Sequence, residues 1–293
     1  MTTEKKCFDQ DGYFHVEGVV TAQDLKKVEK DIFSFARLFA KKINHDTDPQ
    51  EPRKSKANGK GNNKIKINNE KDFSDFCVFL EKYNPAYFFE FIRLVSKLSS
   101  VLNFVNTIVK DKLLKITSNI LNEKTSNLLT SYPPAFLVNP PKNKRILYHW
   151  HNAKNGYPKR NSYVNYWIPL ITDKTSKNGT LLVGDKSHHQ DYPHLEYKET
   201  SKYGDVALTQ NLISDKLVNK FKKITVKCKV GSCWGMHRYL LHSSSLNHSN
   251  KCSYVLVFKI WSIANDWTLS SDIEQKYFHN DPGSGKDVDI IQK

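Results

Sequence analysis

The chain has 293 residues, 39% of them hydrophobic and 12% aromatic, which excludes a disordered chain and suffices for a domain with a substantial core. Its 45 Lys and Arg against 30 Asp and Glu give a net charge of +15, but the basic residues are spread along the chain, which disfavours a nucleic-acid-binding protein. The five Cys lie far apart, and neither a membrane-length apolar run nor a signal-peptide core occurs, so we expect a cytoplasmic protein without a disulfide framework or membrane contact.

The first 127 residues are predicted to be largely helical. Apolar residues recur at spacings of three and four from Leu25 to Phe39, which predicts an amphipathic helix with Thr21 as its N-cap. Near residues 46–70, the lack of periodicity and the abundance of Gly, Asn and Lys indicate a mobile loop. Two further helices are expected, one with an apolar face from Phe89 to Leu98 and one from Lys112 to Leu121.

From Leu128 onward the pattern changes to short apolar runs separated by Pro, Asn, Gly and Lys. The runs read AFLV, RILYHW, SYVNYWIPL, GTLLV, ITVKCKV and SYVLVFKIW. Strands this short and closely spaced predict a sandwich or barrel rather than a parallel α/β sheet. We therefore expect one domain over residues 1–293, with the helical portion 1–127 packed on a β core at 128–265 and a C-terminal tail at 266–293.

Two segments contain histidines suited to binding a metal. His149 and His151 lie in the run YHWHNA, on an expected strand, and His242 lies in the segment from Gly231 to Asn247. Histidines from two distant strands of a barrel can converge on a metal in its mouth. The usual redox iron site of this kind adds a carboxylate two residues after the first His, because residues i and i+2 of a strand share a face.

Short motifs run through the chain in a consistent order around these histidines. They are FDQDGYFHVEGVV at 8–20, WHNA at 150–153, YWIPL at 166–170, NGTL at 178–181, GDKSH at 184–188 and the segment 231–247. Together they resemble the phytanoyl-CoA dioxygenase family of Fe(II)/2-oxoglutarate oxygenases, whose motifs include W-H-Q-D or W-H-Q-E, W-I-P-L, N-G-x-L, P-G-S-H and H-x-S-x-x-N. The ordered set extends from residue 8 to about residue 261, which is nearly the whole chain.

The resemblance implies a mainly β fold, a double-stranded β-helix (jelly roll) with N-terminal helices packed against it. It also implies that Fe(II) is held by His151 and His242 and that 2-oxoglutarate and O2 are co-substrates. Trp167 would lie near the 2-oxoglutarate, and Ser244 would contact its carboxylate. The substrate would be a small molecule, and the Lys-rich composition favours an anionic or carrier-linked one.

The first departure from the family is the missing acidic ligand, because Ala153 stands at its position. In the related aliphatic halogenases, Ala or Gly at this position frees one coordination site and removes one negative charge, so that chloride or bromide binds the metal. Ala153 is therefore the residue that predicts halogenation of an aliphatic C–H bond, with chloride as an additional ligand of the iron.

Other ligand sets remain open at this point. A hydroxylase or another oxidase with three His ligands is possible, because His149 is two residues before His151 and can join it and His242. An acid from elsewhere, Asp185 or Glu196, is a further candidate. A non-catalytic protein, or a nucleic-acid-binding β-barrel, is the alternative of another class.

The second departure concerns the charge that pairs with 2-oxoglutarate, because the family's Arg falls at Ser253. Along the last strand Lys259 has the same parity as Ser253 and therefore shares its face. A Lys among apolar neighbours there needs a partner for its buried charge. We therefore expect Ser253 and Lys259 in the co-substrate site, with Lys259 as the counter-charge and Arg145 or Lys251 as weaker candidates.

Overall fold

The computed structural model describes residues 1–46, 66–101, 104–130, 134–153, 163–195, 212–262 and 264. Its helices are α1 (Thr3–Asp11), α2 (Ala22–Asp46), α3 (Glu70–Tyr83), α4 (Pro85–Val101), α5 (Phe104–Leu121), η1 (Thr125–Asn127), η2 (Ser187–His189) and α7 (Asp215–Val218). Its strands are β1 (Tyr13–Val16), β2 (Leu128–Thr130), β3 (Ala135–Asn139), β4 (Tyr163–Leu170), β5 (Leu181–Gly184), β6 (Lys223–Thr225), β7 (Cys233–His237), β8 (His242–Ser244) and β9 (Ser253–Ser262). In these ranges no helix is long and apolar enough to cross a membrane.

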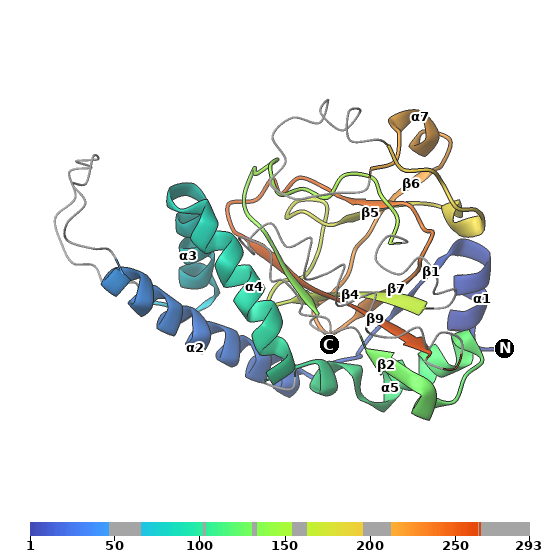
Figure 1. The fold of residues 1–293 in the computed structure, drawn as a ribbon, viewed down its shortest axis with the longest axis horizontal. Helices are drawn as coiled ribbons and strands as arrows, with labels where there is room; N and C mark the ends of the chain where they lie inside the picture. Colours follow the sequence, from blue (N-terminus) through green and yellow to red (C-terminus); the bar gives the residue numbers. More distant parts are fainter. Residues whose placement is uncertain are drawn as a thin grey trace, which may run out of the picture.

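The strands form two antiparallel sheets. The larger sheet has the order β1-β7-β4-β9-β2, and β3 pairs with the first part of β9. The smaller sheet has the order β6-β5-β8. Figure 1 shows α2 to α5 along one side of the larger sheet, and β5 and β6 on its other side. The larger sheet is therefore a middle layer between the helices and the smaller sheet.

The helices form where the apolar periodicity predicts them. The hydroxyl of Thr21 accepts a hydrogen bond from the backbone N–H of Asp24 at 3.1 Å, which confirms it as the cap of α2. Val28 and Ile32 of this helix are buried in the core. Glu70, at the C-terminal end of the predicted loop at 46–70, is the first residue of α3. Residues 47–65 of that loop lie outside the described ranges.

Two expectations about local structure need correction. In α4, Val95 is buried as expected, but the other buried apolar residues are Phe88 and Phe91, and Phe89 and Leu98 are only partly buried. The run RILYHW forms no strand: the carbonyl of Tyr148 accepts a hydrogen bond from the N–H of Ser244 at 2.7 Å, but the regular pairing of a ladder is missing, and His151, the next residue, makes an isolated bridge to His242. The predicted strands AFLV, SYVNYWIPL and SYVLVFKIW are present as β3, β4 and β9.

Candidate active site

Strand β9 separates two environments because its side chains alternate between the two faces of the larger sheet. Tyr254, Leu256 and Phe258 belong to the core shared with the helices. Val255 and Val257 belong instead to a second apolar cluster between the two sheets. The inner face of the larger sheet is where the residues expected to carry the chemistry meet.

His151 and His242 lie against each other on this inner side. Their backbones exchange hydrogen bonds of 3.0 and 2.9 Å, and their ring centroids are 4.2 Å apart. Nδ1 of His151 is 2.6 Å from the carbonyl oxygen of His149, and Nδ1 of His242 is 2.8 Å from that of Leu240. A carbonyl that accepts from Nδ1–H fixes the tautomer whose Nε2 lone pair is available to a metal, so the pair fits an iron site.

Burial keeps both imidazoles neutral. It lowers the pKa of His151 to about 3, with a further contribution from His242, and lowers the pKa of His242 to about 4. The positive charge of Lys259 acts on both rings in the same direction. Neutral imidazoles are the form that binds a metal, so the site is ready for a cation near neutral pH.

The position beside the pair lacks an acid. The N–H of Ala153 donates to the carbonyl of Arg238 at 3.0 Å, and the Tyr163 hydroxyl donates to the carbonyl of Ala153. Among the described residues, no three His, Cys, Asp or Glu side chains are close enough together to hold a metal. The expected pair of histidines is therefore brought together without a third protein ligand from this part of the chain.

The other metal ligands considered from the sequence are His149, Asp185 and Glu196, and the two that the structure describes make different contacts. His149 contributes its carbonyl to His151 rather than its ring to a three-His set, and Asp215 is the charge that acts on its imidazole. Asp185 accepts a hydrogen bond from the Tyr13 hydroxyl at 3.2 Å. Glu196 lies outside the described residues.

Positive charge gathers around Tyr163, next to Ala153. The Lys259 ammonium lies 5.3 Å from the centre of the Tyr163 ring, and the Arg238 guanidinium lies 5.8 Å from it. Arg238 is only 2% exposed, and its Nε and Nη1 find no hydrogen-bond partner in the described part of the chain. A buried guanidinium in this state favours an anion nearby.

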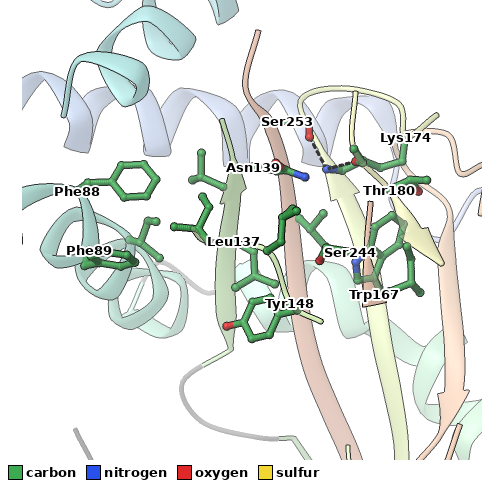
Figure 2. A pocket seen from close by; sticks show the side chains of 17 residues that line it. Phe88, Phe89, Leu137, Asn139, Tyr148, Trp167, Lys174, Thr180, Ser244 and Ser253 are labelled. Carbon is green, nitrogen blue, oxygen red and sulfur yellow. Dashed lines mark hydrogen bonds between the residues drawn. The ribbon is translucent and has the colours of Figure 1, made fainter. Parts of the chain in front are cut away.

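A cavity that is partly open to solvent extends between the sheets toward α4. It begins close to the histidines, since Ser244 is two residues after His242 and the Tyr148 ring lies 5.7 Å from that of His151. Trp167, Ser244 and Ser253 all line it, as the sequence predicts for a co-substrate site. In Figure 2, Phe88 and Phe89 of α4 stand at the end of the cavity away from Trp167.

The candidate counter-charges from the sequence do not reach this cavity. Lys259 shares the inner face with Ser253 but lies six residues further along β9, which corresponds to about 20 Å. Arg145 is exposed, and Lys251 forms an ion pair with Glu70 at 3.5 Å.

Among the described residues, Lys174 is a cation that does line the cavity, and sequence reasoning missed it. Its side chain is 2% exposed, and its Nζ donates to Ser253 Oγ at 2.7 Å and to the carbonyl of Gly179 at 3.3 Å. Nothing in the sequence distinguishes Lys174 from its exposed neighbour Lys177. Only the fold reveals its burial and its contact with Ser253.

The family model described as phytanoyl-CoA dioxygenase (PhyH) matches residues 8–253. Among solved structures, EvdO2 from Micromonospora carbonacea var. aurantiaca is similar, with 13% identity, coverage of 89% of this chain and 91% of that chain, and a TM-score of 0.54; it has also been solved with 2-oxoglutarate.

A second similar structure is the epimerase SnoN in complex with Fe3+, alpha ketoglutarate and nogalamycin RO. Its identity is 13%, the match covers 97% of this chain and 91% of that chain, and the TM-score is 0.52. At such identities the likeness establishes a shared fold only. No match was found among curated proteins.

Proposed function

This chain belongs to the phytanoyl-CoA dioxygenase family of Fe(II)/2-oxoglutarate-dependent oxygenases, and from that membership we propose that it oxidises an aliphatic C–H bond of a small molecule, with halogenation as its specific reaction. The membership places the chain among enzymes, in preference to a nucleic-acid-binding protein. The observation that carries the specific proposal is a buried, neutral His pair with Ala153 where the family has an acid.

In this proposal His151 and His242 hold Fe(II) through Nε2. When bound, iron together with 2-oxoglutarate and O2 supplies the oxidising chemistry. The chain orients both rings through the carbonyls of His149 and Leu240, which accept from Nδ1–H. The two antiparallel sheets would be the two halves of a double-stranded β-helix.

The halide position follows from charge and space. With Ala153 in place of an acid, the metal and its two neutral His ligands keep one more positive charge than the family's usual site. Lys259 and Arg238 add positive charge around Tyr163, beside Ala153. Both effects favour an anion next to the metal, and chloride is small enough for the place of the missing side chain.

The same charges support an anionic or carrier-linked substrate. Arg238 is buried, with two nitrogens that lack a hydrogen-bond partner within the described ranges. A phosphate or carboxylate of the substrate would satisfy them. In SnoN, which shares the fold, the bound molecule is nogalamycin RO, and a small molecule is the substrate class we propose here.

A chloride titration under anaerobic conditions tests the proposal. The affinity of the Fe(II)-loaded protein for 2-oxoglutarate is measured in potassium chloride and in potassium acetate of equal ionic strength. Chloride is expected to tighten binding by about 5-fold or more, the range of coupling between linked ligands. Equal affinities in the two salts would refute the halide position while leaving the oxygenase assignment intact, whereas failure to bind Fe(II) would refute the iron site.

A further inference from the structure

Lys174 is a buried ammonium without an acidic partner. It belongs to no ion pair of the described residues, and burial lowers its pKa to about 7. The Cys252 side chain is the titratable group that influences this pKa, and Nζ also lies 5.9 Å from the centre of the Trp167 ring. Burying a charge without a counter-charge is costly, so a fold that keeps Lys174 here is expected to receive an anion at this position.

The loop that carries Lys174 is held so that the side chain points inward. The backbone of Lys174 exchanges hydrogen bonds of 2.7 and 3.1 Å with Cys228. The following turn closes on Asn178, whose Oδ1 accepts from Thr175 N–H at 2.9 Å, and reverses at Gly179 with φ of +76°. That positive φ requires Gly in practice, which gives the N-G pair a structural role in aiming Lys174.

The hydrogen bonds of Ser253 determine which partner donates in its contact with Lys174. The Ser253 hydroxyl donates to the carbonyl of Asn178 at 2.6 Å, so it can only accept from Lys174. An ammonium has three N–H donors, and those to Ser253 and Gly179 account for two. Figure 2 shows the pair side by side at the cavity wall, with both hydrogen bonds of Lys174 drawn. The third donor is available to a ligand in the cavity.

We propose that Lys174, oriented by Ser253, is the residue that receives the distal carboxylate of 2-oxoglutarate in this protein. The inference rests on the proposed function and replaces Lys259 in that role. The family's Arg position holds a small Ser, and a cation from another loop occupies the vacated space. The Lys259 charge then acts at the metal end of the site, where it influences His151 and His242.

The test compares the affinities of two 2-oxo acids for the anaerobic Fe(II)-loaded protein, measured by calorimetry. 2-Oxopentanoate has the chain length of 2-oxoglutarate but lacks the distal carboxylate. In Lys174→Met, 2-oxoglutarate should bind at least about 30-fold more weakly, the lower end of the cost of truncating a buried charge pair, while 2-oxopentanoate binding changes little. Lys177→Met, an exposed Lys on the same loop, is the matched control and should behave as wild type.

Moving the charge back provides a second measurement. Lys174→Ala with Ser253→Arg restores a cation at the family position and should recover the preference for 2-oxoglutarate over 2-oxopentanoate. Wild-type affinity for 2-oxoglutarate should fall as pH rises above about 7, because the ammonium loses its proton there. The Arg variant should show no such fall, since guanidinium stays charged. A merely structural Lys174 would not produce this difference.

The outcomes separate the two proposals. If the wild type binds Fe(II) but neither 2-oxo acid, the proposed function fails. If the wild type prefers 2-oxoglutarate and Lys174→Met keeps that preference, only the assignment of Lys174 fails. If circular dichroism shows that Lys174→Met does not fold, the Lys174→Ala/Ser253→Arg variant and the wild-type pH profile decide. The inference is overturned if the double variant does not prefer 2-oxoglutarate over 2-oxopentanoate and the wild-type affinity for 2-oxoglutarate does not change with pH.

Discussion

Tyr166 and Trp167 are neighbours on β4 but belong to opposite faces of the larger sheet. Tyr166 packs in the helix-covered core against Phe14 and Phe258. Trp167 lines the cavity on the inner face, near Lys174 and Ser253. The outer face of the described sheet is packed almost wholly by apolar and aromatic side chains, whereas the inner face brings together the imidazoles and the cations.

Stability and chemistry are therefore divided between the two faces of the larger sheet. Close packing of rings on the outer face holds the sheet rigid, so that on the inner side His151, which makes only an isolated bridge, can be held against His242 of β8. Substitutions on the inner face should therefore change ligand binding with little effect on stability, and those on the outer face should do the opposite.

The largest effect is expected from His151→Ala or His242→Ala. Each removes half of the protein's proposed metal donors, so Fe(II) stoichiometry should fall to near zero and iron-dependent turnover of 2-oxoglutarate should be lost. Equilibrium dialysis with iron analysis measures the first and succinate formation the second. His248→Ala, at an exposed position, is the control. Full iron binding by either variant would show that the His pair on the inner face does not hold the metal.

A change of chloride dependence is expected from Ala153→Asp. The added carboxylate would occupy the coordination position and cancel one positive charge, so 2-oxoglutarate affinity should no longer respond to chloride. The same titration in chloride and acetate measures it, with Ala153→Ser as a control of similar size that adds no negative charge. Chloride dependence that persists in the Asp variant would place the halide elsewhere.

On the outer face, Phe258→Ala should cost about 3–5 kcal/mol of unfolding free energy, because it removes a fully buried ring and leaves a cavity. Urea denaturation measures the loss. Leu129→Ala, at a side chain that is 39% exposed, should change stability by less than about 1 kcal/mol. Iron stoichiometry of the folded Phe258→Ala protein should match wild type; loss of iron from a folded variant would show that the two faces are not independent.

The smallest effect is expected from Tyr166→Phe. The Tyr166 and Thr117 hydroxyls are 2.7 Å apart, and Thr117 also donates to the carbonyl of Leu113 at 2.8 Å. Tyr166 is therefore the donor to Thr117, and its loss should cost about 1 kcal/mol. A shift in the denaturation midpoint at unchanged 2-oxoglutarate affinity is the expected result. An altered affinity with unchanged stability would contradict the division between faces.

Much of this arrangement could be predicted from sequence because it depends on local pattern. Apolar runs marked β4 and β9, the three-and-four spacing marked α2, and the motif order brought His151 and His242 to one site. The sequence does not distinguish the buried face of α4, because both of its faces are apolar and Phe88 of one and Phe89 of the other both line the cavity. The segment before His151 was misassigned as a strand because its apolar side chains pack without a partner ladder.

The counter-charge was beyond sequence reasoning for a different reason. Lys174 and Ser253 are 79 residues apart, and their contact depends on a loop closed at Asn178 and Gly179. The alternation of side chains along β9 correctly predicts that Lys259 lies on the inner face with Ser253. It does not predict which end of the cavity a side chain reaches. Among the Lys residues that the structure describes, burial distinguishes Lys174 as one that lines the cavity.

The most direct test is a crystal structure grown without oxygen in the presence of Fe(II), 2-oxoglutarate and chloride. We expect a metal bound by Nε2 of His151 and His242, with chloride in the coordination position next to Ala153. A carboxylate from the chain or the His149 ring in that position would contradict it.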